Sequence, residues 1–175
     1  MTSLVITMVG PDRPGLVSAL SDKAVEYGAN WADSLMANFA GQFAGIVQLE
    51  VPSENCAALM AALNALGSPH LRIVIARAQG GASMAATRRL RLDLVGHDRP
   101  GIIHAISSQL AKHGVSITKL QTHIASGAMS GEQMFHMKAQ LTVPTTLDTD
   151  ALRAGLEGLA NELMVDIGFD GGPDV

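Results

Sequence analysis

One segment occurs twice in this chain. The stretch LVITMVGPDRPGLVSAL begins at Leu4, and the similar stretch LRLDLVGHDRPGIIHAI begins at Leu90. The tetrapeptide Asp-Arg-Pro-Gly occupies residues 12–15 in the first copy and 98–101 in the second. One long copy in each half predicts a duplicated domain rather than a solenoid of short repeats. Any function of this tetrapeptide is therefore encoded in two places.

The duplication sets the expected domain boundaries. We predict a first domain at 1–79 and a second domain at 88–170. A linker at 80–87 joins them, and a tail follows at 171–175. Domains of roughly 80 residues bury a limited fraction of their surface and are marginally stable alone. We therefore expect each to pack against another domain or another chain.

The first stretch of each repeat has the pattern of a half-buried strand. In the second copy Leu90, Leu92 and Leu94 alternate with Arg91 and Asp93. Successive side chains of a strand point to opposite faces of its sheet. The three leucines are therefore expected to face a core, and the two charged residues to face solvent.

Each repeated turn leads into a helical pattern. Pro14 and Pro100 are expected at the first helical position, where a missing N–H costs nothing. Gly28 and Gly114 follow the last apolar residues of these patterns and are expected to end the helices in a left-handed conformation.

The remaining elements follow in the same order in both copies. In the first copy the sequence predicts a second strand at 30–39 and a third strand that ends at 51–52. A second helix is predicted at 53–66 and a last strand at 71–78. The order strand, helix, strand, strand, helix, strand thus occurs twice. We predict an α+β chain of two ferredoxin-like βαββαβ domains, each an antiparallel four-stranded sheet with two helices on one face.

Composition limits the classes of partner. Charged residues are 16% of the chain, against about 25% in typical proteins. A sparsely charged surface favours association, so we expect a homodimer or a higher oligomer. The net charge of −4 argues against direct nucleic-acid binding. The single cysteine, Cys56, excludes an intrachain disulfide and is expected to be buried in a helix. With no apolar run of about 18 residues, we expect a cytoplasmic protein without membrane contact.

The repeated turn has the chemistry of an anion site. The first N–H groups of a helix have no intrahelical partner, and the helix dipole adds partial positive charge there. Such a terminus suits a carboxylate. Asp12 or Asp98 could pair with an ammonium group, so the two features together describe a free α-amino acid. Arg13 is expected to point away. The structural alternative remains open, because aspartate is a common helix cap and Pro-Gly is common turn chemistry.

These residues and their layout resemble a known family. The Gly-x-Asp-Arg-Pro-Gly turn and the Gly-Ala-Asn at 28–30 resemble the ACT domain, a small regulatory module. The tandem pair with little else attached resembles the glycine cleavage system transcriptional repressor group. The resemblance covers roughly residues 2–79 and 88–170, nearly the whole chain. It implies side-by-side pairing of domains and an amino acid bound where domains meet.

The resemblance also indicates which residues contact the ligand. The ligand carboxylate would meet backbone N–H groups of the turn and the helix start, and a residue at the entry to the second strand would add a contact. In the first copy the candidates are Asp12, Pro14, Gly15, Leu16 and Asn30; in the second they are His97, Asp98, Gly101, Ile102 and Ser116. The second site differs from the first, because Ser116 has fewer hydrogen-bonding groups than Asn30 and His97 replaces a proline. Binding of one ligand per chain, at the first site alone, is therefore an alternative to binding at both sites.

The sequence suggests no catalytic or metal chemistry. No helical pair of histidines, cysteine cluster, phosphate-binding loop or nucleophile elbow occurs, and we expect no cofactor. His123 and His136 could face each other across adjacent strands, although solvated histidines are the simpler reading. We therefore predict a non-enzymatic regulator that senses glycine or a similar amino acid and affects transcription through a DNA-binding activator. The alternatives are a ligand-free interaction module that regulates an amino-acid metabolic enzyme, and an undetected enzyme.

Overall fold

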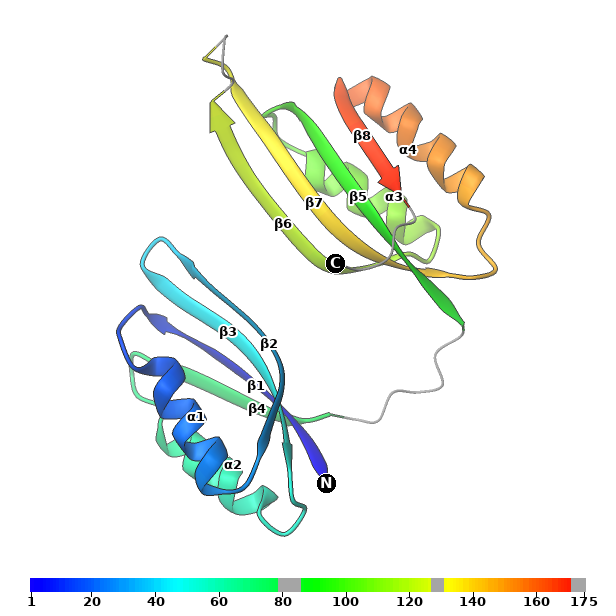
Figure 1. Cartoon of the computed structure of the whole chain (residues 1–175). Helices are drawn as coiled ribbons and strands as arrows, with labels where there is room; N and C mark the ends of the chain where they lie inside the picture. The colour runs from blue at the N-terminus through cyan, green and yellow to red at the C-terminus, as the bar shows by residue number, and fades with distance from the viewer. Residues whose placement is uncertain (79–85, 127–130, 171–175) are drawn as a thin grey trace. The chain divides into compact units, whose positions relative to one another are not determined.

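The computed structural model describes residues 1–78, 86–126 and 131–170, and the chain divides into two compact units, 1–81 and 82–175 (Figure 1). The predicted tail lies outside the described residues. So does most of the predicted linker, of which only Ala86 and Thr87 are described. Thr87 is already the first residue of a strand.

The elements of the two units follow one plan. Unit 1, called domain 1 below, contains β1 (Thr2–Pro11), α1 (Leu16–Glu26), β2 (Asn30–Phe39), β3 (Gln42–Val51), α2 (Cys56–Ala65) and β4 (Arg72–Arg77). Unit 2, called domain 2, contains β5 (Thr87–His97), α3 (Ile102–Lys112), β6 (Ser116–Ser126), β7 (Gln133–Pro144), α4 (Thr149–Leu163) and β8 (Val165–Asp170).

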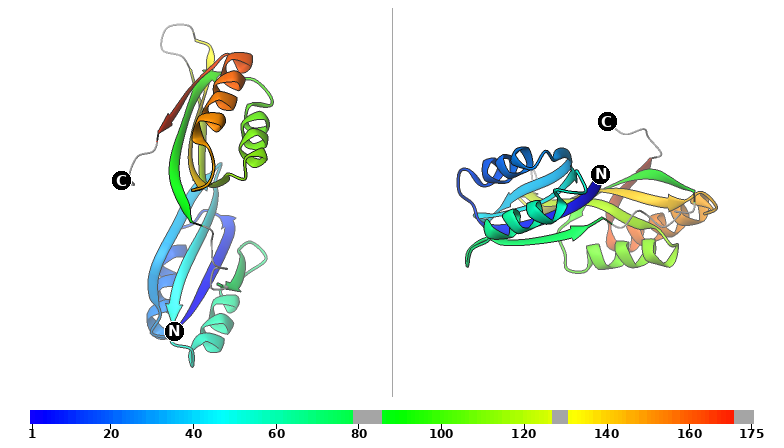
Figure 2. Two further views of the ribbon diagram at one scale, coloured as in Figure 1. Left: turned by 90° about the vertical axis from the view of Figure 1, so that its right-hand side faces the viewer. Right: turned by 90° about the horizontal axis from the view of Figure 1, so that it is seen from below.

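Each unit folds as the sequence predicts. The strands are ordered β2-β3-β1-β4 in one sheet and β6-β7-β5-β8 in the other, and all the neighbours are antiparallel. In both units the two helices cover one face of the sheet and leave the other open (Figures 1 and 2). The ferredoxin-like βαββαβ fold is thus confirmed for both repeats.

The core of each domain lies between the sheet and its helices. In domain 2 Leu90, Leu92 and Leu94 are buried, and Arg91 is exposed on the opposite face, as their alternation predicts. Burying a leucine side chain stabilises a fold by about 1.5–3 kcal/mol. Cys56 is also buried, in the core of domain 1, which confirms its expected place on the apolar side of a helix.

Both first helices end in the predicted way. Gly28 has φ +65° and Gly114 has φ +68°. After Gly28, the N–H of Ala29 donates to the carbonyl oxygen of Ala24 at 2.8 Å, while the Gly28 N–H donates to that of Val25 at 3.0 Å. This is the Schellman pattern, which satisfies the last carbonyls of a helix. It directs the chain back into the second strand of the sheet.

The second strand of each domain contains one extra residue. In β2 the pairing with β3 shifts between Trp31 and Asp33, so that Ala32 has no opposite residue. In β6 the equivalent shift lies between Ile117 and Lys119. Such a β-bulge reverses the faces to which the following side chains point.

Candidate functional site

Each repeated turn places a glycine immediately before a helix. Gly15 has φ +92° and ψ −3°, and Gly101 has φ +95° and ψ −6°. Neither helix start receives a side-chain cap. The first N–H groups of α1 and α3 therefore keep the anion-binding capacity that the sequence suggests.

The structure corrects the predicted role of the prolines. The helices begin at Leu16 and Ile102, two residues after Pro14 and Pro100. The intervening glycine adopts a left-handed conformation, so the helical run cannot extend back to the proline. Gly15 is thus required by its backbone conformation, and not only by close approach of a ligand.

Asp12 connects the turn to a neighbouring hairpin. Its side chain accepts a hydrogen bond from the Asn38 amide, and its N–H donates to the carbonyl oxygen of Gly41 at 2.9 Å. The structural alternative supposed that Asp12 caps the helix. The start of α1 accepts no side-chain cap, so the Asp12 carboxylate does not have that role. A carboxylate has about four lone-pair sites, so one bond from Asn38 leaves it able to accept from a further donor.

The second turn keeps this backbone contact and differs in its side chains. The N–H of Asp98 donates to the carbonyl oxygen of Gln133 at 2.9 Å. By strand register Ile124 occupies the position of Asn38, and its side chain has no hydrogen-bond donor. In the described part of the chain the Asp98 carboxylate has no hydrogen-bond partner. His97 Nδ1 lies 3.3 Å from a carboxylate oxygen of Glu132, and both side chains are more than half exposed.

A hollow of about 200 Å³ lies beside the first turn. It is lined by the turn, by α1, by β1 and β4, and by the connection between α2 and β4: Met8, Arg13, Pro14, Gly15, Leu16, Ala19, Leu20, Leu66, Leu71 and Ile73. Arg13, which the sequence predicts to point away from the turn, is exposed and also belongs to this lining. Leu16 is half-buried at the hollow, whereas its counterpart Ile102 is 2% exposed. The space beside the two turns is therefore filled differently.

The candidate residues do not all lie together. Within domain 1, Asp12, Pro14 and Gly15 lie in the turn after Pro11, and Leu16 begins α1. Asn30 lies at the other end of the sheet, where it pairs with Glu50, which pairs with Ser3. From Ser3 to Pro11 a strand extends about 26 Å at about 3.3 Å per residue. One small ligand cannot touch the turn and Asn30 of the same domain.

Domain 2 has the same division. His97, Asp98, Gly101 and Ile102 adjoin the turn, whereas Ser116 pairs with Thr142 at the far end of the sheet. Asn30 or Ser116 could therefore reach a ligand at such a turn only from a different copy of the domain.

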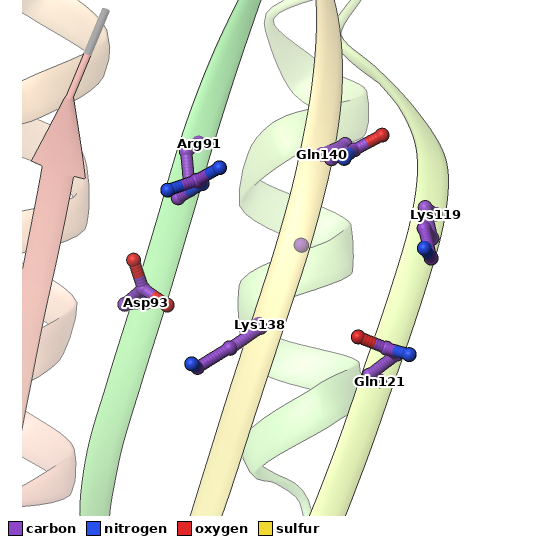
Figure 3. A pocket seen from close by; sticks show the side chains of 7 residues that line it. Arg91, Asp93, Lys119, Gln121, Lys138 and Gln140 are labelled. Atoms are coloured by element: carbon purple, nitrogen blue, oxygen red, sulfur yellow. The ribbon is translucent and has the colours of Figure 1, made fainter. Parts of the chain in front are cut away.

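The open face of the domain 2 sheet carries a polar hollow of about 240 Å³ (Figure 3). Its side chains come from three neighbouring strands: Arg91 and Asp93 on β5, Lys119 and Gln121 on β6, and Lys138 and Gln140 on β7. Among the described residues, none of these side chains has a hydrogen-bond or ion-pair partner. Three cations and one carboxylate give this surface an excess of positive charge. The alternation along β5 predicted Arg91 and Asp93 on this face. The two lysines were not predicted, because their position depends on the strand register.

His123 and His136 do face each other across β6 and β7. Their ring centroids are 4.6 Å apart and the ring planes differ by 5°, which makes a stacked pair. Among residues 1–78, 86–126 and 131–170, no three histidine, cysteine or carboxylate side chains are grouped as metal ligands would be. Nor does any helix in these ranges have the length and apolar character to span a membrane.

Comparisons with known proteins agree with this architecture. The ACT domain model matches residues 2–70 and 89–170. Over 164 residues the chain is 24% identical to the glycine cleavage system transcriptional repressor of Escherichia coli (strain K12), a match that covers 91% of this chain and 85% of that protein. The repressor of the same name from Shigella flexneri matches equally.

Solved structures show the same fold. An unknown protein from Galdieria sulphuraria superposes with a TM-score of 0.86 at 28% identity, covering 98% of this chain and 99% of that one. A protein provisionally assigned as a glycine cleavage system transcriptional repressor superposes with a TM-score of 0.67 at 21% identity, covering 97% and 96%. Since the family match extends over most of both repeats, the chain belongs to the ACT domain family.

Proposed function

We propose that this chain is a non-enzymatic regulatory protein of the cytoplasm that binds a small amino acid, glycine or one of similar size, at the turn between β1 and α1. The observation that carries the proposal is the uncapped start of α1 beside the hollow lined by Arg13, Gly15 and Leu16. Membership of a family of regulatory domains and similarity to the E. coli repressor support it.

The chemistry of the turn fits both ends of a zwitterion. The ligand carboxylate would accept hydrogen bonds from the free N–H groups of the first α1 turn, with Arg13 adding positive charge. The ammonium group would donate to the remaining acceptor sites of Asp12. A volume of about 200 Å³ suits a small ligand, since an engineered cavity of about 150 Å³ accepts benzene.

The second turn contributes less to binding in this proposal. Ile102 is buried where Leu16 is half-buried, so less apolar surface is open to a ligand. We propose that the first site is occupied first and that one amino acid binds per chain at moderate concentrations.

A thermal-shift panel of the twenty amino acids tests ligand binding. A ligand at about 100 times its Kd stabilises the native state by about 2.7 kcal/mol. At about 2–4 °C per kcal/mol, the unfolding midpoint rises by several degrees. Shifts below about 1 °C for every amino acid would contradict the proposal and favour a ligand-free interaction module.

Paired variants locate the site. Charged hydrogen bonds contribute about 1.5–3 kcal/mol, so Arg13→Gln is expected to weaken glycine binding about tenfold or more by calorimetry. The matched variant Arg99→Gln at the second turn is expected to change it by less than about threefold. Asp12→Ala and Asp98→Ala form a second pair. If neither aspartate variant weakens the binding of a demonstrated ligand, the ammonium contact is wrong.

We further propose that any effect on transcription passes through a DNA-binding activator. The net charge of −4 gives little long-range attraction to a phosphate backbone. A gel shift with the pure protein and duplex DNA at moderate salt is expected to show no specific complex. Tight, sequence-specific binding would overturn this part of the proposal.

A further inference from the structure

The open face of the domain 1 sheet is apolar. Of the residues that point away from the helices, the large apolar ones come from all four strands: Phe39 is 70% exposed, Val74 56%, Leu35 55%, Ile46 50% and Val9 43%. Small side chains lie between them, among them Ala37 and Ala44. Contiguous apolar patches of about 300–600 Å² are the largest on typical monomers and often mark binding surfaces.

The repeat shows that the fold does not require this apolar face. The strand registers place Arg91 of domain 2 at the position of Val5, and Lys138 at the position of Ile46. Gln121 occupies the position of Leu35. The same face is thus charged in one domain (Figure 3) and apolar in the other. An apolar face on domain 1 alone indicates a contact made by domain 1 alone.

The open face of the domain 1 sheet carries both a hollow and an exposed aromatic ring. A hollow of about 290 Å³ lies over β1, β2 and β3, lined by Thr7, Met8, Val9, Leu35, Met36, Ala37, Phe39, Ala44, Gly45 and Ile46. Phe39 belongs to this lining and is the most exposed large side chain on the face. In a two-fold arrangement each partner can insert its Phe39 ring into the hollow of the other, because residue i then meets j and j meets i.

We propose that the open face of the domain 1 sheet is a dimer interface, occupied by the same face of a second copy of this chain. The footprint follows from strand geometry. β1, β2 and β3 have ten residues each and β4 has six. At about 3.3 Å per residue and about 4.8 Å between strands, the face covers roughly 350 Å² before side-chain relief is counted. Aligned sheets pack about 10 Å apart through such faces.

Domain 2 of another chain does not fit this surface. Its corresponding face would bring Arg91 and Lys138 against Val5 and Ile46, and burial of unpaired cations is costly. Two copies of the domain 1 face bury no charge at the centre, since Asp33, Glu50 and Arg72 lie at its edges. The proposal does not depend on the amino-acid site at the β1–α1 turn.

Sedimentation equilibrium of the full chain tests the interface. The wild type is expected to be a dimer at about 100 µM and to dissociate on dilution. Ile46→Lys installs the residue that domain 2 already carries at that position, so the fold tolerates it. It is expected to raise the dimer Kd at least about 100-fold, because two lysines would be buried near each other. Circular dichroism verifies that the variant is folded.

The control is the reciprocal change in the other domain. Lys138→Ile is expected to leave the dimer Kd within about threefold of the wild type. A second measurement uses Ala37→Cys, which lies beside the hollow while Cys56 stays buried. Mild oxidation is expected to give a covalent dimer, and Ile46→Lys to suppress it. A wild type that stays monomeric at about 100 µM, or an Ile46→Lys variant that remains a tight dimer, overturns the proposal.

Discussion

The glycine that precedes the first helix of each domain allows a specific test of the turn. An alanine Cβ at Gly15 would have no heavy atom within 4 Å, so Gly15→Ala creates no clash. Its effect on stability comes from the backbone, because φ is +92° and a non-glycine residue in the left-handed region costs about 1–2 kcal/mol. Alanine also lowers the conformational entropy of the unfolded chain, which stabilises the folded state by about 0.4–1 kcal/mol. We expect a net destabilisation of about 0.5–1.5 kcal/mol, and the same for Gly101→Ala.

Gly158 in the middle of α4 is the matched control. Its Cβ would also have open space, and its backbone is helical. Gly158→Ala is expected to stabilise the chain by about 0.5–1 kcal/mol. Urea unfolding followed by circular dichroism measures both variants. The same chemical change should therefore shift the free energy of unfolding in opposite directions at the two sites. If Gly15→Ala equals or exceeds the wild type in stability, the left-handed turn is not needed and the account of the helix start is wrong.

Three further predictions concern other parts of the structure. In Gly96→Ala the new Cβ would lie 2.4 Å from a methyl of Val165, so urea unfolding should show a loss of about 1–3 kcal/mol, and an unchanged midpoint would contradict this packing. Asp148→Ala removes the side-chain cap of α4 and should cost about 1 kcal/mol in the same assay. Hydrogen bonding from the Gln48 amide lowers the pKa of Glu50, so this contribution to stability is present at neutral pH and is lost as pH falls through the lowered pKa. In an NMR titration, Gln48→Leu should raise the pKa of Glu50.

The sequence was sufficient for the fold because two independent signals agree. The duplication defined the repeats, and hydrophobic periodicity located the elements within each. The second strand of domain 1 was expected at 30–39 and is observed at Asn30–Phe39. The left-handed glycines at 28 and 114 were also predicted correctly, since only their position after an apolar helical pattern was needed.

The surfaces were harder to predict, because they depend on register. Proline was placed at the helix start on propensity, but the following glycine takes the left-handed position and delays the helix. Lys119 and Lys138 lie 19 residues apart in sequence and share a face only because β6 and β7 pair around a bulge. Asn38 could not be connected with Asp12 for the same reason. Local patterns determine where strands lie, whereas pairing determines which side chains meet.

The extra residue in β2 has a consequence for how this edge strand can change. Beyond Ala32, alternate residues serve separate purposes, since Asn38 holds the Asp12 turn while Phe39 projects from the opposite side of the sheet. Deleting Ala32 would exchange these sides along the rest of the strand. While the bulge is kept, substitutions of the outward-facing residues of β2 can change the open face of the sheet without changing the inward-facing residues. One peptide segment thereby carries two surfaces that are free to diverge independently.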